Sequence, residues 1–201
     1  MYSRYLAVSA QEKNVLDRIL KKKRANDVLQ IGGFGDTSIM MDMPFVRKFF
    51  LDVDRHAQGA TPFIQGNAEC LPIQSEAMDI ILMMHQLEFT RNPMDSLQEA
   101  YRVLRPNGQL IVLGFNRWSA WNLCHERKKY CSMRKIKRCL FALGFEMLLE
   151  RTFCFWSQST LLETLGQFIL PNAGSVYLFV VQKNIRGMTP LVVSNYRRAP
   201  I

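Results

Sequence analysis

One segment of the chain constrains its architecture more than any other: Gly66-Asn67-Ala68-Glu69-Cys70-Leu71-Pro72-Ile73, followed by Met78-Asp79-Ile80-Ile81-Leu82. A polar turn ends in Leu-Pro, and an aspartate then opens an apolar run that is typical of a strand buried on both faces. Upstream, a glycine-bearing turn follows another apolar run in Leu29-Gln30-Ile31-Gly32-Gly33-Phe34-Gly35-Asp36. Together the two segments predict a pocket for an adenosine-bearing ligand.

Short apolar runs alternate with helical patterns along the rest of the chain. Strands are expected at 28–31, 49–54, 62–65, 80–84, 109–113, 145–153 and 176–182. Helices are expected at about 10–24, 92–105 and 132–144. This alternation predicts an α/β fold with a doubly wound, mainly parallel seven-stranded sheet of the Rossmann-like kind. Because no clear crossover joins the last two strands, the C-terminal strand is expected to be antiparallel.

The length of 201 residues fits one domain. We expect a single domain over 1–185, in which about 117–170 forms a lid or substrate region. The polar residues 186–201, which include Arg197 and Arg198, are expected to form a loose basic tail.

The formal net charge of +9 is concentrated in blocks, chiefly 21–24 and 127–138. Such blocks attract nucleic acid, lipid headgroups or acidic metabolites, but a solvated cationic face without a partner is the simpler interpretation. No apolar run is long enough to span a bilayer, and the polar N-terminus predicts a cytoplasmic protein. The five cysteines and three histidines have no metal-ligand spacing, so we expect free thiols and no metal.

Two segments resemble the class I S-adenosylmethionine-dependent methyltransferases, specifically the type 11 group. They are the segment around Asn67 and Leu71-Pro72-Ile73 and the turn Arg102-Val103-Leu104-Arg105-Pro106-Asn107-Gly108. Gly114-Phe115-Asn116 and the ending Val180-Val181-Gln182-Lys183 look like a small proteobacterial branch of that family. The resemblance implies S-adenosylmethionine as cofactor and methyl transfer to an acceptor, most simply a small molecule.

The resemblance also implies cofactor-binding residues at the turns that follow the strands. Gly32, Gly33 and Gly35 would let a ligand approach the backbone, because a Cβ would obstruct it. Gln30 stands where the family usually has an acid. The family's ribose-binding acid corresponds to Asp52 or Asp54, of which Asp54 lies nearer the strand end.

Two further positions complete the predicted site. Asn67 would bind the adenine amino group through its side-chain oxygen, and Ala68 would donate a backbone N–H to the ring. His85 follows the fourth strand, near the expected methyl group, where a neutral imidazole could accept a proton from the acceptor. The alternative is a histidine that only hydrogen-bonds the backbone or the cofactor.

Three other functions remain open at this point. The departures at Gln30, Phe34 and Asp36 favour a catalytically impaired S-adenosylmethionine-binding protein of the same fold. The basic blocks favour an RNA-associated methyltransferase or another nucleic-acid binder. A nicotinamide dehydrogenase fits less well, since the segment from Gly33 to Ser38 lacks the last glycine of the dinucleotide fingerprint.

Overall fold

The computed structural model of the chain describes residues 2–33, 36–52, 62–88, 90, 92–116, 132–153 and 174–184. Its secondary-structure elements in chain order are α1 (Tyr2–Leu20), β1 (Asp27–Gly32), α2 (Ser38–Met41), β2 (Arg47–Asp52), β3 (Phe63–Gln65), β4 (Met78–Met84), the 3-10 helix η1 (Gln86–Glu88), α3 (Pro93–Val103), β5 (Leu104–Phe115), α5 (Met133–Ala142), β6 (Phe145–Phe153) and β7 (Val176–Lys183).

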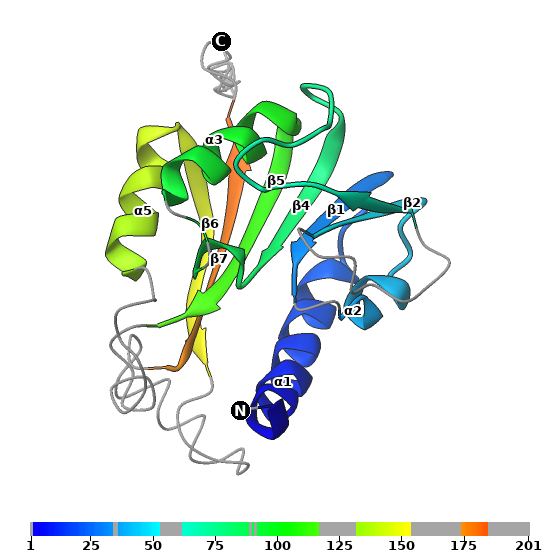
Figure 1. Cartoon of the computed structure of the whole chain (residues 1–201), viewed down its shortest axis with the longest axis vertical. Helices are drawn as coiled ribbons and strands as arrows, with labels where there is room; N and C mark the ends of the chain where they lie inside the picture. Colours follow the sequence, from blue (N-terminus) through cyan, green and yellow to red (C-terminus); the bar gives the residue numbers. More distant parts are fainter. Residues whose placement is uncertain are drawn as a thin grey trace, which may run out of the picture.

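The strands form one seven-stranded sheet in the order β3-β2-β1-β4-β5-β7-β6 (Figure 1). β1 to β5 are parallel to one another, whereas β7 runs antiparallel to both β5 and β6. This confirms the predicted α/β fold with a mainly parallel sheet and an antiparallel C-terminal strand. The strand order reverses between β1 and β4, and in sheets of this kind ligands bind beyond the carboxyl ends at such a point.

Both faces of the sheet are covered, and successive side chains of its central strands point alternately to one covered face and the other. Ile81 and Met83 of β4 pack in the core that α3 and α5 cover, while Leu82 and Met84 pack in the core that α1 covers. Leu16 of α1 is fully buried in this second core. The near-continuous apolar runs in the sequence are the consequence of this two-sided burial.

The helices begin and end at places that differ in part from the predicted ones. α1 extends from Tyr2 to Leu20, so the basic run at 21–24 follows the helix instead of ending it. α3 opens as predicted, with Pro93 in its first turn and Asn92 Oδ1 accepting a hydrogen bond from Met94 N. It ends at Val103, however, because Leu104 adopts an extended conformation.

The predicted lid at 117–170 is described only over its middle. There, α5 buries Ile136 and Leu140 against the core, and β6 forms the edge of the sheet beside β7. This part belongs to the body of the domain. The remainder of the lid region, strand residues 53 and 54, and the predicted tail lie outside the described residues.

Candidate functional site

The carboxyl ends of the parallel strands meet along one side of the sheet, here called the carboxyl edge. Gly32 at the end of β1 is paired with Met84 at the end of β4, and His85 follows directly. β2 ends nearby at Asp52, and β3 leads into the turn that contains Asn67. The fold therefore gathers along this edge residues that the sequence places at four separate turns.

The turn after β1 requires glycine. Gly32 and Gly33 have φ angles of +74° and +94°, which side chains rarely adopt. A Cβ on Gly32 would lie 2.7 Å from the carbonyl oxygen of Met84, and a Cβ on Gly33 would lie 2.9 Å from Nε2 of Gln30. The turn therefore packs against Met84 and Gln30 in a way that only glycine allows at these two positions. Gly35 lies outside the described residues.

Gln30 supports this turn from within. Its side chain is buried, and Nε2 donates hydrogen bonds to the carbonyl oxygens of Gly32 at 3.2 Å and of Asp36 at 2.7 Å. A carboxylate could not donate these bonds, which explains how a neutral amide serves at this position. The amide oxygen Oε1 is buried and has no hydrogen-bond partner among the described residues.

Asp52 is half-buried at the end of β2. Its backbone oxygen accepts a hydrogen bond from Gly66 N at 3.2 Å, which joins the turn after β2 to the turn after β3. The position at the strand end suits a carboxylate that binds hydroxyl groups. Asp54, the other predicted candidate, lies outside the described residues.

The turn at Asn67 is closed by its own polar groups. Asn67 Oδ1 accepts from Glu69 N at 3.1 Å, and Cys70 N donates to Asn67 O at 3.1 Å. Asn67 is exposed, whereas Ala68 is fully buried. Cys70, a free cysteine in this turn, is exposed.

Arg102 of α3 ties this turn to the rest of the domain. Its guanidinium donates to the carbonyl oxygens of Leu71 at 3.0 Å and Ile73 at 2.9 Å. It also pairs with Glu99, whose carboxylate accepts a bond from Leu71 N at 2.9 Å. This bidentate clamp, whose donors match the carbonyl and carboxylate geometry, makes the two segments that carry the resemblance one structural unit.

His85 lies at the centre of a buried polar cluster. Its Nε2 is 2.8 Å from Oε1 of Glu12 in α1, and its Nδ1 is 3.2 Å from Oε1 of Glu88 in η1. The same Glu88 oxygen accepts from Phe115 N at 2.6 Å, and the His85 ring packs on the Phe115 ring with centroids 4.2 Å apart. All three polar side chains are almost completely buried.

This geometry determines the charge of the ring. Burial alone would lower the pKa of His85, but the two facing carboxylates more than offset it and raise the pKa to about 10. The ring is therefore protonated at neutral pH, with both nitrogens donating to carboxylates. This differs from the neutral imidazole expected from the sequence, because that expectation did not include the two acids.

Glu12 and Glu88 are the main residues of this edge that the sequence analysis did not predict. One signal for Glu12 was present, since it lies four and eight residues before Leu16 and Leu20 on the apolar stripe of α1. A glutamate on such a stripe needs a buried partner. The identity of the partner, 73 residues away, follows only from the packing of α1 on the sheet.

The residues present suit a ligand that combines a cationic amino-acid part with a nucleoside, as S-adenosylmethionine does. The glycine turn has no room for a Cβ, and Gln30 Oε1 is a buried acceptor without a partner among the described residues. Glu12 Oε2 is a second such acceptor within the same described part of the chain. Orphaned acceptors are suited to the ammonium and hydroxyl donors of such a ligand.

Comparison with known proteins gives a consistent result. Residues 46–112 match the family model Methyltransf_11, described as a methyltransferase domain. A ubiquinone/menaquinone biosynthesis C-methyltransferase, UbiE, from Azotobacter vinelandii is 30% identical over 112 residues. That match covers 47% of this chain and 44% of the relative, so this chain spans less than half of the curated protein that it matches.

Solved structures match over nearly the whole chain. A protein from Thermotoga maritima, described as an S-adenosylmethionine-dependent methyltransferase and possible histamine N-methyltransferase, superposes with a TM-score of 0.70 at 23% identity, covering 91% of this chain and 94% of that one. The [4+2]-cyclase SpnF superposes with a TM-score of 0.66 at 15% identity, covering 87% and 80%.

The chain thus has the fold of the S-adenosylmethionine-dependent methyltransferases, and the predicted resemblance to the type 11 group is confirmed over the matched segment. Within the described residues, no helix is long and apolar enough to cross a membrane.

Proposed function

We propose that this protein transfers a methyl group from S-adenosylmethionine to a small-molecule acceptor at the carboxyl edge. The observation that carries the proposal is the placement of two turns at the same edge of the sheet, after β1 and after β3. One is the positive-φ glycine turn at Gly32–Gly33, and the other is the polar turn at Asn67, which a bond between Gly66 and Asp52 joins to the end of β2. A nucleoside with an amino-acid extension needs contacts of both kinds on one rim.

Each part of the ligand has a candidate partner. Backbone groups of Gly32 and Gly33, with Gln30 Oε1, face the amino-acid part, since Gln30 has an acceptor to offer there. Asp52 or Asp54 binds the ribose hydroxyls. Asn67 and the buried backbone of Ala68 bind the adenine.

The bound cofactor supplies a methyl group that its positively charged sulfur already activates. The chain's own residues then have to orient the acceptor and exclude water, and alignment alone can contribute about 7–11 kcal/mol in ideal cases. His85 does not act by removing a proton from the acceptor, because both of its nitrogens donate to carboxylates. We infer that its role is to hold η1 and the end of β5 against α1.

A small acceptor is favoured over a polymeric one. The polar side chains at the ends of β4 and β5 are deeply buried, with His85 1% and Asn116 2% exposed, so they offer no surface to a polymer. The name of the curated relative, a C-methyltransferase of ubiquinone and menaquinone biosynthesis, points the same way. RNA remains the alternative, through exposed cations such as Arg134 and Arg138 on α5.

A second candidate function is a cofactor-binding protein of the same fold that does not transfer a methyl group. Two observations favour it: His85 has no nitrogen available to accept a proton, and the solved cyclase shows that this fold is not confined to proteins named methyltransferases. Direct binding and turnover distinguish the two functions.

Isothermal titration with S-adenosylmethionine tests the proposal. We expect a dissociation constant between about 1 µM and 1 mM, the range typical of enzyme ligands. Release of S-adenosylhomocysteine with a panel of small quinone, phenol and amine acceptors would identify the transferase. Binding without turnover on any small or RNA acceptor would support the second candidate, and absence of binding would contradict both.

A further inference from the structure

Two adjoining hollows lie at the amino-terminal edge of the sheet, opposite the carboxyl edge. Their volumes are about 370 Å³ and 680 Å³. The smaller lies beside the turn Pro106-Asn107-Gly108, the larger lies beside Pro44 and Val46, and both share Lys23, Arg24 and Asp79. Among the described residues, the charged side chains that line the two hollows are five cations and one carboxylate: Lys21, Lys22, Lys23, Arg24, Arg105 and Asp79.

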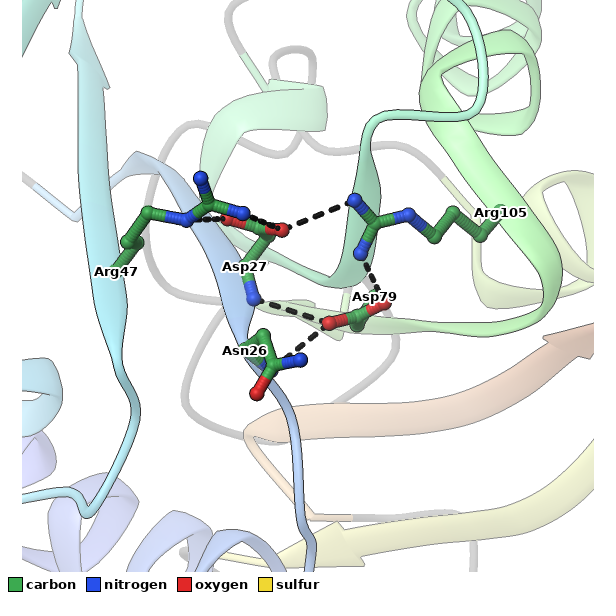
Figure 2. A network of polar contacts seen from close by, with 5 residues as sticks. All are labelled: Asn26, Asp27, Arg47, Asp79 and Arg105. Atoms are coloured by element: carbon green, nitrogen blue, oxygen red, sulfur yellow. Dashed lines mark hydrogen bonds and ion pairs between the residues drawn. The ribbon is translucent and has the colours of Figure 1, made fainter.

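The carboxylate does not oppose an anion here, because it belongs to a balanced ion-pair network (Figure 2). Asp79 pairs with Arg105 and accepts hydrogen bonds from the backbone N–H groups of Asn26 at 2.8 Å and Asp27 at 3.0 Å. Asp27 pairs with both Arg105 and Arg47. Two arginines and two aspartates thus neutralise one another and fix the chain segments around the hollows.

The basic run at 21–24 adds positive charge that this network does not compensate. Lys21 pairs with Asp17 at 2.7 Å. No carboxylate among the described residues pairs with Lys22, Lys23 or Arg24, and the Lys23 ammonium donates to the neutral side chain of Gln109. Three cations therefore face the hollows without a counter-charge from the described part of the chain.

Lys23 shows the electrostatic consequence. Its side chain is partly buried, and this burial lowers the pKa of its ammonium below the usual value. A cation held away from water beside a neutral amide is stabilised when an anion enters next to it. The hollow is therefore short of negative charge, which a ligand would provide.

We propose that these hollows bind the phosphate or diphosphate group of an anionic ligand. Two adjoining hollows that share Lys23 and Arg24 suit a ligand with more than one negative charge. The lysine ammonium groups offer compact positive charges, and the planar arginine guanidinium offers paired N–H donors. Both kinds of group recognise phosphate oxygens. In the described part of the chain, no aromatic side chain lines either hollow, so we expect the site to recognise the phosphate and not a stacked base.

Binding of inorganic diphosphate, measured by isothermal titration, tests this site. The variant Lys22→Gln/Lys23→Gln/Arg24→Gln is expected to bind diphosphate about tenfold or more weakly than the wild type. The matched control is Arg134→Gln/Lys135→Gln/Arg138→Gln, which removes the same charge from the exposed face of α5. We expect the control to change the affinity by about twofold or less.

A parallel assay with vesicles of phosphatidylglycerol and of phosphatidylcholine distinguishes the two sources of the phosphate. Diphosphate binding that only the first variant loses indicates a soluble ligand, and phosphatidylglycerol binding that only this variant loses indicates a lipid headgroup. Equal losses in both variants, or no binding of either probe by the wild type, would overturn the proposal. S-adenosylmethionine binding should be unchanged in both variants, which keeps this result separate from the methyl-donor site.

Discussion

The free energy of unfolding of the His85→Leu variant is expected to be about 3–5 kcal/mol lower than that of the wild type at neutral pH. The substitution removes the cation between Glu12 and Glu88 and leaves two buried carboxylates without it. Breaking a buried pair in this way costs more than the pair contributes, because an uncompensated charge remains in the interior. Equilibrium unfolding in urea, followed by circular dichroism, measures the difference.

The pH dependence separates this cause from lost packing. The pKa of His85 is raised to about 10 in the folded protein, above its unfolded value of about 6.5. The charged ring therefore contributes fully to the free energy of unfolding below the unfolded pKa. Between the two pKa values this contribution falls by roughly 1.4 kcal/mol per pH unit, and it is lost as the pH rises through about 10. The difference between wild type and His85→Leu should therefore shrink steadily from neutral pH to about pH 10.

The double variant Glu12→Leu/His85→Leu is the matched control. It removes one of the two stranded carboxylates together with the cation, so we expect it to recover part of the stability lost in the single variant. A single variant destabilised by less than about 1 kcal/mol, or equally at all pH values, would contradict the assigned cluster.

The second large effect is expected for Gly32→Ala, which should weaken S-adenosylmethionine binding about tenfold to hundredfold. The new Cβ would lie 2.7 Å from Met84 O and 2.9 Å from Gln86 Oε1, at a φ of +74°. The turn must therefore move, and its backbone groups move with it. Isothermal titration of the folded variant measures the loss of affinity.

Gly108→Ala is the control for a general loss of structure. Its Cβ would meet the Arg105 carbonyl oxygen at 2.8 Å, a similar crowding at the amino-terminal edge of the sheet. We expect this variant to lose stability but to keep the wild-type affinity for S-adenosylmethionine. Equal affinities in Gly32→Ala and the wild type would mean that the glycine turn does not contact the cofactor.

The positions of most strands, the burial of the central strand on both faces and the glycine turn were predictable, because local sequence patterns specify them. The run Ile80–Met84 is apolar throughout since both faces of β4 are covered. Glycine at positions 32 and 33 is consistent with the positive φ angles that the turn adopts there. The antiparallel last strand followed from the missing crossover.

Contacts between distant elements were not predictable in the same way. Arg105 was expected to close a helix, but it instead joins the starts of β1 and β4 through Asp27 and Asp79. The charge of His85 likewise depends on an acid of α1 that meets it only after the helix packs on the sheet. A local pattern indicates that such a polar group needs a partner, but tertiary packing determines which partner it finds.

A crystal structure of the protein with S-adenosylhomocysteine tests the central claim most directly. We predict the ligand along the carboxyl edge, with its amino-acid part against Gly32 and Gly33 and its adenine beside Asn67 and Ala68. A ligand bound at the opposite edge of the sheet, or along the carboxyl edge without contact to either turn, would contradict the account.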